Sequence, residues 1–410
     1  MADKTTGKVP RIRFKAYTEP WADEKIGDVI AERRRPIVLE DDQRYELITV
    51  KRRNEGVVSR GHLLGRDILV KNYAELKAGD FVISKRQVVH GATGIVPPAL
   101  DGAIVSNEYL TVIDSKKLLT EFLTIVASLP AMRRKFFLSS YGVDIEKLFF
   151  DVDDWKKRSV MLPDVREQSR MGQFFRKLDQ LITLHQCKHD KLLTLKKAML
   201  QKMLPKIGAA TPEIRFNGFT EAWNQRNLGD ISSLQTGYPF EGKKFVDKGI
   251  LLVRGMNIKR GYLDSSKEVS EYWSSIEGFE IFLLKDNDIV IQMDGALIGK
   301  SFAKIEKENL PALLVQRVTR IRCAIVNCDF IYANIQKGFL DYIRVNKTET
   351  AVPHLSLNDI RNFAVKLPCE AEQQKIGAYF RTLDELIIQH ATQLQKLQQI
   401  KSSCLAKMFV

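Results

Sequence analysis

The sequence lacks a long apolar run and has few cysteines. No stretch approaches the ~18 apolar residues that a membrane-spanning helix needs, and Met1 to Pro10 is polar, without the apolar core typical of a secretory signal. These absences argue against a membrane-spanning or secreted protein, so we expect a cytoplasmic one. The five cysteines are odd in number and form no C-x-x-C pair, which disfavours a disulfide framework and a four-ligand zinc site.

Common catalytic motifs are also missing. The sequence has no phosphate-binding G-x-x-x-x-G-K-[ST] loop, no G-x-S-x-G elbow and no H-E-x-x-H helix. Asp230 with Glu241, Gly242 and Lys243 could mimic the carboxylate pair of a Mg²⁺-dependent nuclease, but the first half of the chain has Leu39 where the second has Glu241. We interpret this spacing as coincidence and do not expect a catalytic centre.

His185 and His189 are four residues apart and could bind a metal from one face of a helix, with Cys187 between them. His185 and His390, however, occupy the same position in two repeated segments, which favours polar residues that fix the register of a helix pair. No metal site is therefore expected.

Acidic residues are outnumbered by basic ones. The 410 residues include 64 Lys and Arg against 50 Asp and Glu, a formal net charge of +14. This balance favours a polyanionic partner such as nucleic acid over an acidic small molecule.

The dominant feature of the sequence is a duplication. The run from Pro10 to Phe14, with Trp21, Gly27 and Asp28 after it, returns 202 residues later as Pro212 to Phe216, Trp223, Gly229 and Asp230. A second pattern, from Leu162 to Arg176, returns as Leu367 to Arg381. The period is half the chain, far longer than that of a solenoid, so it indicates a domain and a helix that occur twice.

Short strand patterns fill the two regions outside the helices. Residues 45–50, 80–84, 249–253 and 288–291 read as strands, whereas 115–128, 311–316 and 355–362 read as short helices. We predict α+β domains at 1–160 and 207–365, each with a mostly antiparallel sheet, followed by helices at 161–206 and 366–410.

Both helical segments have a seven-residue apolar repeat typical of a coiled coil. The repeat runs through Met171, Leu178, His185, Leu192 and Met199, and again through Ile376, Leu383, His390, Leu397 and Cys404. A helix of roughly 38 residues spans about 57 Å, too long to bury its apolar seam against its own domain. Because of the chain connectivity, we expect the helices to pair antiparallel, with pseudo-two-fold symmetry and a domain at each end.

Basic and amide side chains cluster around loops and strand ends, where Lys and Arg can neutralise phosphates and Arg, Gln or Asn can read base edges. The DNA-binding candidates are Arg34, Lys51, Arg52, Arg53, Arg60, Lys85, Arg86, Gln87 and His90 in the first half, and Lys243, Lys244, Arg254, Lys259, Arg260, Gln292, Lys300, Gln316 and Arg317 in the second. Arg33, Arg35, Arg66, Arg320, Arg322 and Arg344 belong to the same basic clusters.

These features resemble the DNA-specificity subunit of type I restriction-modification systems. The resemblance rests on the P-x-I-R-F…W…G-D opening of each half and on the L-P…E-Q…G…F-R…L-D…L-I run of each helix, in that order and twice. It covers essentially the whole chain. It implies two target recognition domains that read the halves of a split double-stranded DNA sequence, with paired helices that set the gap.

The resemblance also implies the partners. Two methyltransferase subunits would methylate adenine N6 with S-adenosylmethionine, and a motor-nuclease subunit would use ATP and Mg²⁺, whereas this chain would need no cofactor. The N-P-P-(Y/F) motif of the methylating partner is absent here. Two alternatives remain: a duplicated coiled-coil scaffold or adaptor without DNA specificity, and a nuclease centred on Asp230 and Glu241.

Overall fold

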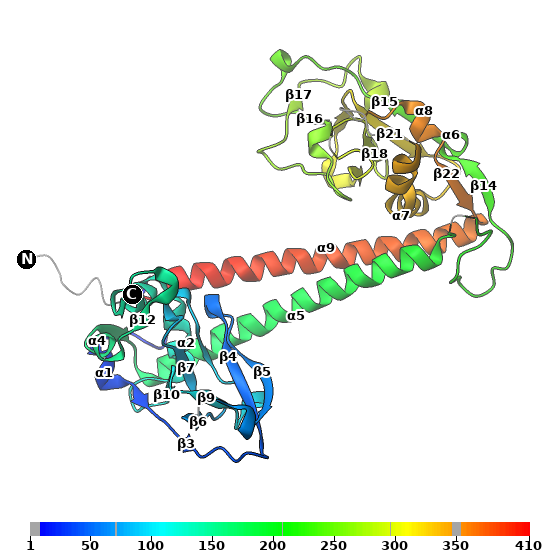
Figure 1. Cartoon of the computed structure of the whole chain (residues 1–410). Helices are drawn as coiled ribbons and strands as arrows, with labels where there is room; N and C mark the ends of the chain where they lie inside the picture. Colours follow the sequence, from blue (N-terminus) through cyan, green and yellow to red (C-terminus); the bar gives the residue numbers. More distant parts are fainter. Residues whose placement is uncertain (1–8, 70–71, 207, 296, 347–353) are drawn as a thin grey trace, which may run out of the picture. The chain divides into compact units, whose positions relative to one another are not determined.

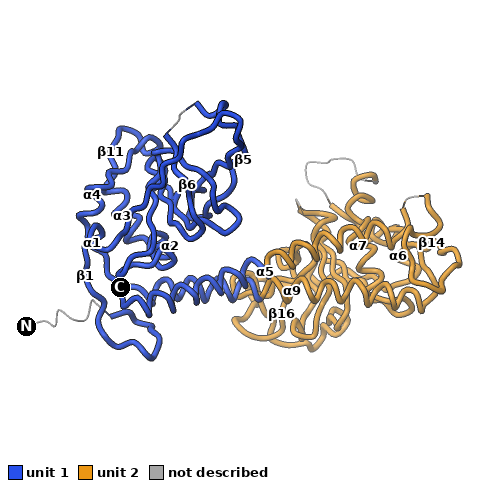
Figure 2. Tube along the Cα trace, turned by 90° about the horizontal axis from the view of Figure 1, so that it is seen from below, with its two compact units in different colours: residues 1–185, 393–410 blue, residues 186–392 orange. Residues whose placement is uncertain are grey.

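The computed structural model describes residues 9–69, 72–206, 208–295, 297–346 and 354–410. The chain forms two compact units, unit 1 with residues 1–185 and 393–410 and unit 2 with residues 186–392 (Figures 1 and 2). The long helices α5 (Val165–Met203) and α9 (Glu370–Lys407) each contribute one segment to each unit. Of the helices in the described ranges, none is both long and apolar enough to cross a membrane.

Unit 1 mixes helices with sheets, as expected of an α+β domain. Its larger sheets have the orders β2-β10-β7-β8 and β3-β6-β9-β4-β5, and β1 pairs with β13 and β11 with β12. The strands are β1 Ala22–Lys25, β2 Ala31–Glu32, β3 Pro36–Ile37, β4 Arg44–Val50, β5 Val57–Leu64, β6 Tyr73–Glu75, β7 Phe81–Ser84, β8 Thr93–Ile95, β9 Ile104–Ser106, β10 Tyr109–Ile113, β11 Ser140–Tyr141, β12 Phe149–Phe150 and β13 Ser159–Leu162. The shorter helices are α1 Ile26–Val29, α2 Thr120–Ser128, α3 Pro130–Leu138 and α4 Val152–Lys156.

Unit 2 repeats this plan. Its four-stranded sheet has the order β15-β21-β18-β19, a second sheet has the order β17-β16-β20, and β14 pairs with β22. The strands are β14 Asn224–Asn227, β15 Ser232–Thr236, β16 Ile250–Val253, β17 Tyr272–Trp273, β18 Ile289–Gln292, β19 Phe302–Lys304, β20 Ala312–Leu314, β21 Val318–Cys323 and β22 Ala364–Leu367. The shorter helices are α6 Leu228–Ile231, α7 Cys328–Asn346 and α8 Leu357–Arg361.

The two units share a four-stranded sheet but differ in their second sheet, which has five strands in unit 1 and three in unit 2. The four-stranded sheets match position for position, and the second sheet of each unit contains one parallel pair, β4 with β9 and β16 with β20. The other strand pairs are antiparallel, as expected. Even the turns correspond, because Gly79 before β7 and Asn287 before β18 both have positive φ, 90° and 67°.

The four predicted strands are confirmed as β4, β7, β16 and β18, and the helix at 355–362 as α8. The helix predicted at 311–316 is wrong. Residues Ala312–Leu314 form the fully buried strand β20, parallel to β16. A short apolar run after a proline fits either structure, and pairing in the sheet decides between them.

The helix predicted from Ser115 begins later, at Thr120. The Ser115 hydroxyl accepts hydrogen bonds from the Lys117 and Leu118 backbone N–H groups, and Asp114 accepts one from the Thr120 N–H. These side-chain bonds hold residues 114–119 as a turn, which competes with helix formation.

The repeated motifs are the joint between each domain and its helix. Arg13 donates to both carboxylate oxygens of Glu167 at 2.7 Å, and Arg215 donates to those of Glu372 at 2.9 and 2.7 Å. Both glutamates are buried. The pairing raises the pKa of each arginine, chiefly through the hydrogen bond to its glutamate.

The next motif residue binds the domain backbone. The Gln168 carbonyl oxygen accepts the Leu119 N–H at 3.0 Å, while its amide donates to the Pro163 carbonyl. Gln373 does the same with the Asn327 N–H, at 3.1 Å, and with the Pro368 carbonyl. Each E-Q pair therefore ties the start of a long helix to the opening segment and to the root of α2 or α7.

Apolar contacts complete the joint. Trp21 packs edge-on against Phe122 in unit 1, and Trp223 against Phe330 in unit 2. In unit 1, the core that contains Trp21 also contains Met171, Phe175 and Leu178 of α5. The domain and the helix therefore share one core. Burial of each such side chain contributes about 1.5–3 kcal/mol to its stability.

The two long helices pair within each unit. In unit 1, Phe175 of α5 packs against Phe409, two residues past the end of α9, whereas Asp179 further along α5 forms an ion pair with Lys401 of α9. As the residue number rises along α5, from 175 to 179, the number of its partner falls, from 409 to 401. The two helices are therefore antiparallel in unit 1. In unit 2, Lys196 of α5 forms an ion pair with Asp384 of α9.

Candidate nucleic-acid interface

In unit 1, several candidate residues come together at one edge of the sheets, which we call the unit 1 edge (residues 51–54, 85–91 and 107–109). The last residue of β7, Ser84, pairs with the first residue of β10, Tyr109, so the turns that follow and precede these strands are neighbours. The Asn54 N–H donates to the Gly91 carbonyl, which brings in the turn after β4. Lys51, Arg52, Arg53, Lys85, Arg86, Gln87 and His90 all lie here.

Acidic partners hold part of this edge. Arg86 bonds to Glu108 at 2.6 Å and lies over the Phe149 ring, while Arg52 binds Glu146 at 2.7 Å. These ion pairs are about half exposed, so they contribute at most about 1 kcal/mol each and can exchange for phosphate. Burial raises the pKa of Tyr109, and the charge of Arg60 opposes that shift. Arg60 itself lies within β5, opposite the step from Leu47 to Ile48 in β4, rather than at the strand ends.

The equivalent unit 2 edge comprises residues 254–257, 292–295 and 315–317. Gln292 at the end of β18 pairs with Val318 at the start of β21, and the Met293 N–H donates to the Arg317 carbonyl. The parallel pairing of β16 and β20 brings Arg254 beside the 315–317 turn, because the Val315 N–H donates to the Val253 carbonyl. Gln316 and Arg317 are exposed in that turn.

The start of β19 extends this edge. Ser301 accepts the Gln292 N–H, so Lys300 lies beside the end of β18. Arg260 forms an isolated bridge with Phe302 in β19, and the neighbouring Lys259 forms an ion pair with Asp264 at 3.7 Å. Most of the basic candidates of unit 2 therefore lie around one group of strand ends.

Backbone strain is concentrated at these edges. Of the four non-glycine residues with positive φ in the described chain, Arg53 (60°), Asn54 (58°) and Arg317 (64°) lie at them. Such conformations cost of order 1–3 kcal/mol for most residues and tend to occur at functional sites. The turn sequence Lys51-Arg52-Arg53-Asn54 therefore presents its side chains in a conformation that the surrounding fold enforces.

Some candidates do not gather there. Arg34, between β2 and β3, binds Asn72, which precedes β6. Lys243 and Lys244 lie in an exposed turn that leads to the start of β16, at the far end from Arg254. Arg254 itself bonds to the Val269 carbonyl and lies over the Phe245 ring, so it also holds a loop.

Three arginines of the basic clusters point inward. Arg35 binds Asp80 and Arg322 binds Asp288, each through two hydrogen bonds. Burial lowers the pKa of Arg320, which is 5% exposed. These side chains stabilise the sheets rather than present charge to a ligand.

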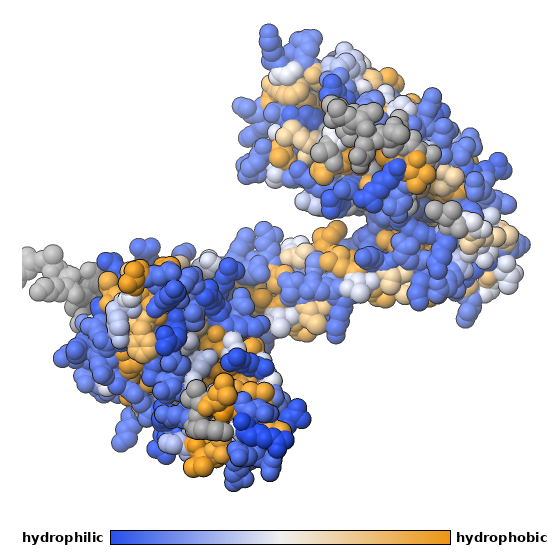
Figure 3. Space-filling model, in the orientation of Figure 1, coloured by the Kyte–Doolittle hydropathy of each residue, from blue (hydrophilic) through white to orange (hydrophobic). Residues whose placement is uncertain are grey.

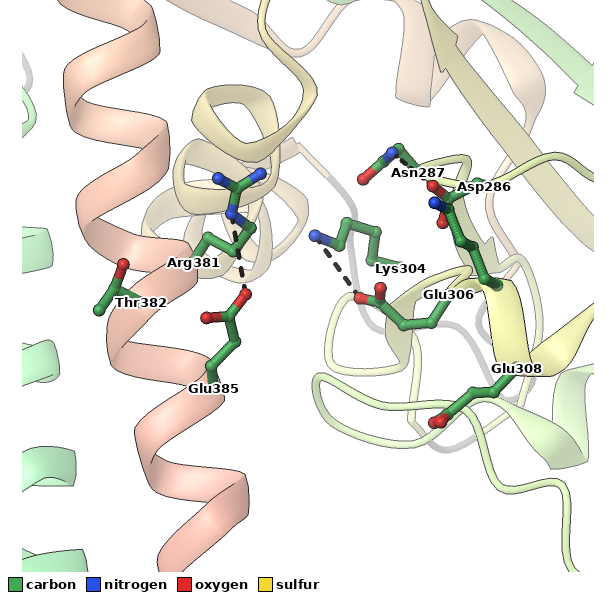
Figure 4. A pocket seen from close by; sticks show the side chains of 9 residues that line it. Asp286, Asn287, Lys304, Glu306, Glu308, Arg381, Thr382 and Glu385 are labelled. Carbon is green, nitrogen blue, oxygen red and sulfur yellow. Dashed lines mark hydrogen bonds and ion pairs between the residues drawn. The ribbon is translucent and has the colours of Figure 1, made fainter.

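In unit 2, a hollow of about 540 Å³ lies between α9 and the loops around β18 and β19 (Figure 4). Burial is the largest single effect and lowers the pKa of Lys304, but the hydrogen bond to Asp329 together with the charges of Asp329 and Glu306 raises that pKa overall. Arg381 on α9 pairs with Asp329 and Glu385. The lining has three cations and four anions, so it is a self-neutralised part of the joint rather than a polyanion site; it comprises Asp286, Asn287, Lys304, Glu306, Lys307, Glu308, Arg381, Thr382 and Glu385.

The structure adds residues that the sequence did not single out. Tyr238 (39% exposed) bridges to Val315, and Met256 (51% exposed) follows β16 at the same edge. Gly237 before Tyr238 is required, since a Cβ there would lie 2.3 Å from the Val315 backbone. The Gly237-Tyr238 pair directly after β15 is the sequence feature that could have predicted Tyr238 as a residue of this edge. In the described ranges, no group of three His, Cys, Asp or Glu side chains is placed to hold a metal ion.

Comparison with known proteins gives a consistent result. Residues 220–401 match the model of the type I restriction modification DNA specificity domain. The chain is 30% identical over 210 residues to the specificity subunit of the type I restriction enzyme EcoAI of Escherichia coli, covering 48% of this chain and 34% of that one. The match thus spans about a third of that relative's length.

Two further similarities extend over nearly the whole chain. The MjaVIII specificity subunit of Methanocaldococcus jannaschii is 22% identical over 423 residues, covering 93% of this chain and 90% of the relative. The crystal structure of a type I restriction-modification S subunit from M. genitalium matches with a TM-score of 0.64 at 13% identity, covering 98% and 99% of the two chains. The second match shows that the folds are alike.

Proposed function

Since the chain belongs to the family of type I restriction-modification DNA specificity subunits, we propose that it selects the DNA sequence on which such a system acts. The target would be a split site in double-stranded DNA, with one half read by the domain of each unit. The observation that carries this proposal is the duplication of the edge. Two equivalent groups of strand ends, at 51–54 with 85–91 and at 254–257 with 292–295, carry basic and amide side chains.

The long helices support a fixed gap between the half-sites. α5 and α9 have 39 and 38 residues, and the Asp179–Lys401 and Lys196–Asp384 ion pairs connect them within unit 1 and within unit 2. The buried Arg13–Glu167 and Arg215–Glu372 pairs fix each domain to its helix. We infer that the helices act as a spacer between two recognition domains, with half-sites about one helical turn of DNA apart.

The chemistry would belong to partners. We infer that two methyltransferase subunits, which would bind S-adenosylmethionine, dock on this chain and methylate adenine N6, and that motor-nuclease subunits with ATP and Mg²⁺ complete a restriction complex. Exposed apolar side chains on the helices suit such docking, among them Leu184 (47% exposed), Ile388 (60%) and Ile400 (46%); Figure 3 shows hydrophobic residues at the helix surface. Flipping of the target base would fall to the methylating partner.

The proposal is tested by co-expressing this chain with a type I methyltransferase partner in a host without other adenine methylation and sequencing the methylome. We expect methylated adenines in one bipartite motif, and the same motif from a randomised DNA pool bound by the purified complex. A single continuous motif would remove the spacer argument.

The adaptor alternative is favoured only by the apolar helix surface. It predicts a stable complex with the partner protein that binds DNA without sequence preference. The nuclease alternative predicts Mg²⁺-dependent cleavage by this chain alone, which Asp230→Asn would abolish.

A further inference from the structure

Gln292 is presented at the unit 2 edge without an internal partner. Its carboxamide makes no hydrogen bond with any described residue, although its backbone N–H is held by Ser301. Two glycines flank the side chain. A Cβ on Gly255 would lie 3.2 Å from the Gln292 side chain, and one on Gly295 would lie 3.3 Å from its amide nitrogen. The absence of side chains at both positions leaves the carboxamide accessible to another flat polar group.

Arg317 lies beside it on the neighbouring strand end. Its side chain is 70% exposed, and its Nη1 donates to Asp294 at 3.0 Å. Among the described residues, no acceptor contacts Nε or Nη2, the two donors along the other edge of the guanidinium. Asp294 therefore orients the fork while leaving a bidentate edge free. The positive φ of 64° and the bond from the Met293 N–H fix the backbone that carries it.

We propose that Gln292 and Arg317 are the side chains that determine which bases unit 2 reads. The inference rests on the proposed DNA recognition and names the residues that would give it specificity. A glutamine carboxamide matches the N6 and N7 edge of adenine, and an arginine fork matches the O6 and N7 edge of guanine, both in the major groove. Unit 2 would thus select an adenine and a guanine close together in its half-site.

The corresponding positions in unit 1 hold different chemistry. Ser84 ends β7 where Gln292 ends β18, and Glu108 precedes β10 where Arg317 precedes β21. Glu108 is occupied by Arg86. One scaffold with different side chains at the same two places would read two different half-sites.

The test uses Gln292→Ala and Arg317→Gly in the full chain with its methyltransferase partner. Glycine adopts the positive φ of position 317 without strain, so Arg317→Gly removes the side chain without disturbing the turn. Lys285→Ala is the matched control, because it removes an exposed cation at the opposite end of β18. For each variant, the recognised motif is measured on randomised DNA and its folding is checked by thermal unfolding.

We expect each edge variant to lose discrimination at one position of a single half-site, by roughly 5- to 150-fold, the size of one good bidentate contact. The adenine position should relax in Gln292→Ala and the guanine position in Arg317→Gly, while the other half-site and the gap stay unchanged. Lys285→Ala should keep the wild-type motif. An unchanged motif in both edge variants, or equal loss at every position, would overturn the inference. If the wild-type complex selected no motif, the proposed function itself would fail.

Discussion

At the residue scale, the two buried arginine–glutamate pairs are the most informative contacts. Glu167 and Glu372 have no exposure to solvent, and each would be an isolated buried charge without its arginine. Such a pair adds little net stability over an apolar replacement, but breaking it is costly. The pairs therefore fix where the opening segment of each half meets its helix.

We predict that Arg215→Met destabilises the protein by about 3–5 kcal/mol, because Glu372 then remains buried and uncompensated. Denaturant unfolding at neutral pH measures the change in the free energy of unfolding. The double variant with Glu372→Leu should regain most of the loss. The exposed pair of Lys206 and Glu213 is the matched control, and Lys206→Met should cost no more than about 1 kcal/mol. Equal losses in both single variants would contradict this account.

At the element scale, glycines set how closely the long helices approach their domains. A Cβ on Gly377 would lie 2.2 Å from the Asn327 side-chain oxygen and 3.0 Å from the Phe330 backbone nitrogen, at the start of α7. On Gly172, the three nearest atoms would all belong to the flexible side chain of Glu121, at 2.8–3.0 Å. The close contact between the long helix and its domain therefore depends more strictly on glycine in unit 2 than in unit 1.

Gly377→Ala should therefore destabilise unit 2 by about 1–3 kcal/mol, because α9 must move away from α7. Gly172→Ala should cost less, since the Glu121 side chain can turn aside. Gly338→Ala in α7 is the control, because the nearest atom to its Cβ would be 4.0 Å away, and alanine there should be neutral or stabilising by up to about 1 kcal/mol. Thermal unfolding of the three variants ranks their stabilities. A destabilisation by Gly338→Ala as large as that by Gly377→Ala would refute this account.

The sequence predicted elements where local pattern and burial agree. The seven-residue repeats gave helices of nearly the right length, since Met171, Leu178, Ile376 and Leu383 are buried. Residues 311–316 failed because their strand conformation depends on pairing with β16, about 60 residues earlier.

The candidate site shows the same division. The clustered charge predicted the turns at 51–54 and 85–90. It could not predict which basic residues remain available to bind a ligand. Arg322 is taken by Asp288 and Arg35 by Asp80, partners that only the folded sheet brings close. Tyr238 reaches the edge through its bridge to Val315, which no local pattern reveals.

At the scale of the whole molecule, the chain uses one design twice. Each unit has a four-stranded sheet of the same strand order, the same joint and an edge at the same strand ends of that sheet. The amino acids at the edges differ, whereas those at the joints recur. This distribution fits two domains that hold the same orientation on their helices while recognising different ligand chemistry.

If α5 and α9 set the gap, lengthening both should lengthen it without changing what either domain reads. We predict this for four residues inserted between Thr194 and Leu195 together with four between Glu385 and Leu386. In each helix, the insertion lies between the residue of the Lys196–Asp384 pair and that of the Asp179–Lys401 pair. Neither ion pair is interrupted. Four residues add about 6 Å of helix, close to two base-pair steps of ~3.4 Å.

Methylome sequencing should then show the same two half-sites separated by a longer gap. The same four residues placed between Ser266 and Lys267, in an exposed turn of unit 2, should leave the gap unchanged. Recognition with the original gap after the helix insertions would mean that the helices do not measure the spacing. In that case the distance between half-sites would have to be set by the methyltransferase partners, because the two edges belong to separate units joined through α5 and α9.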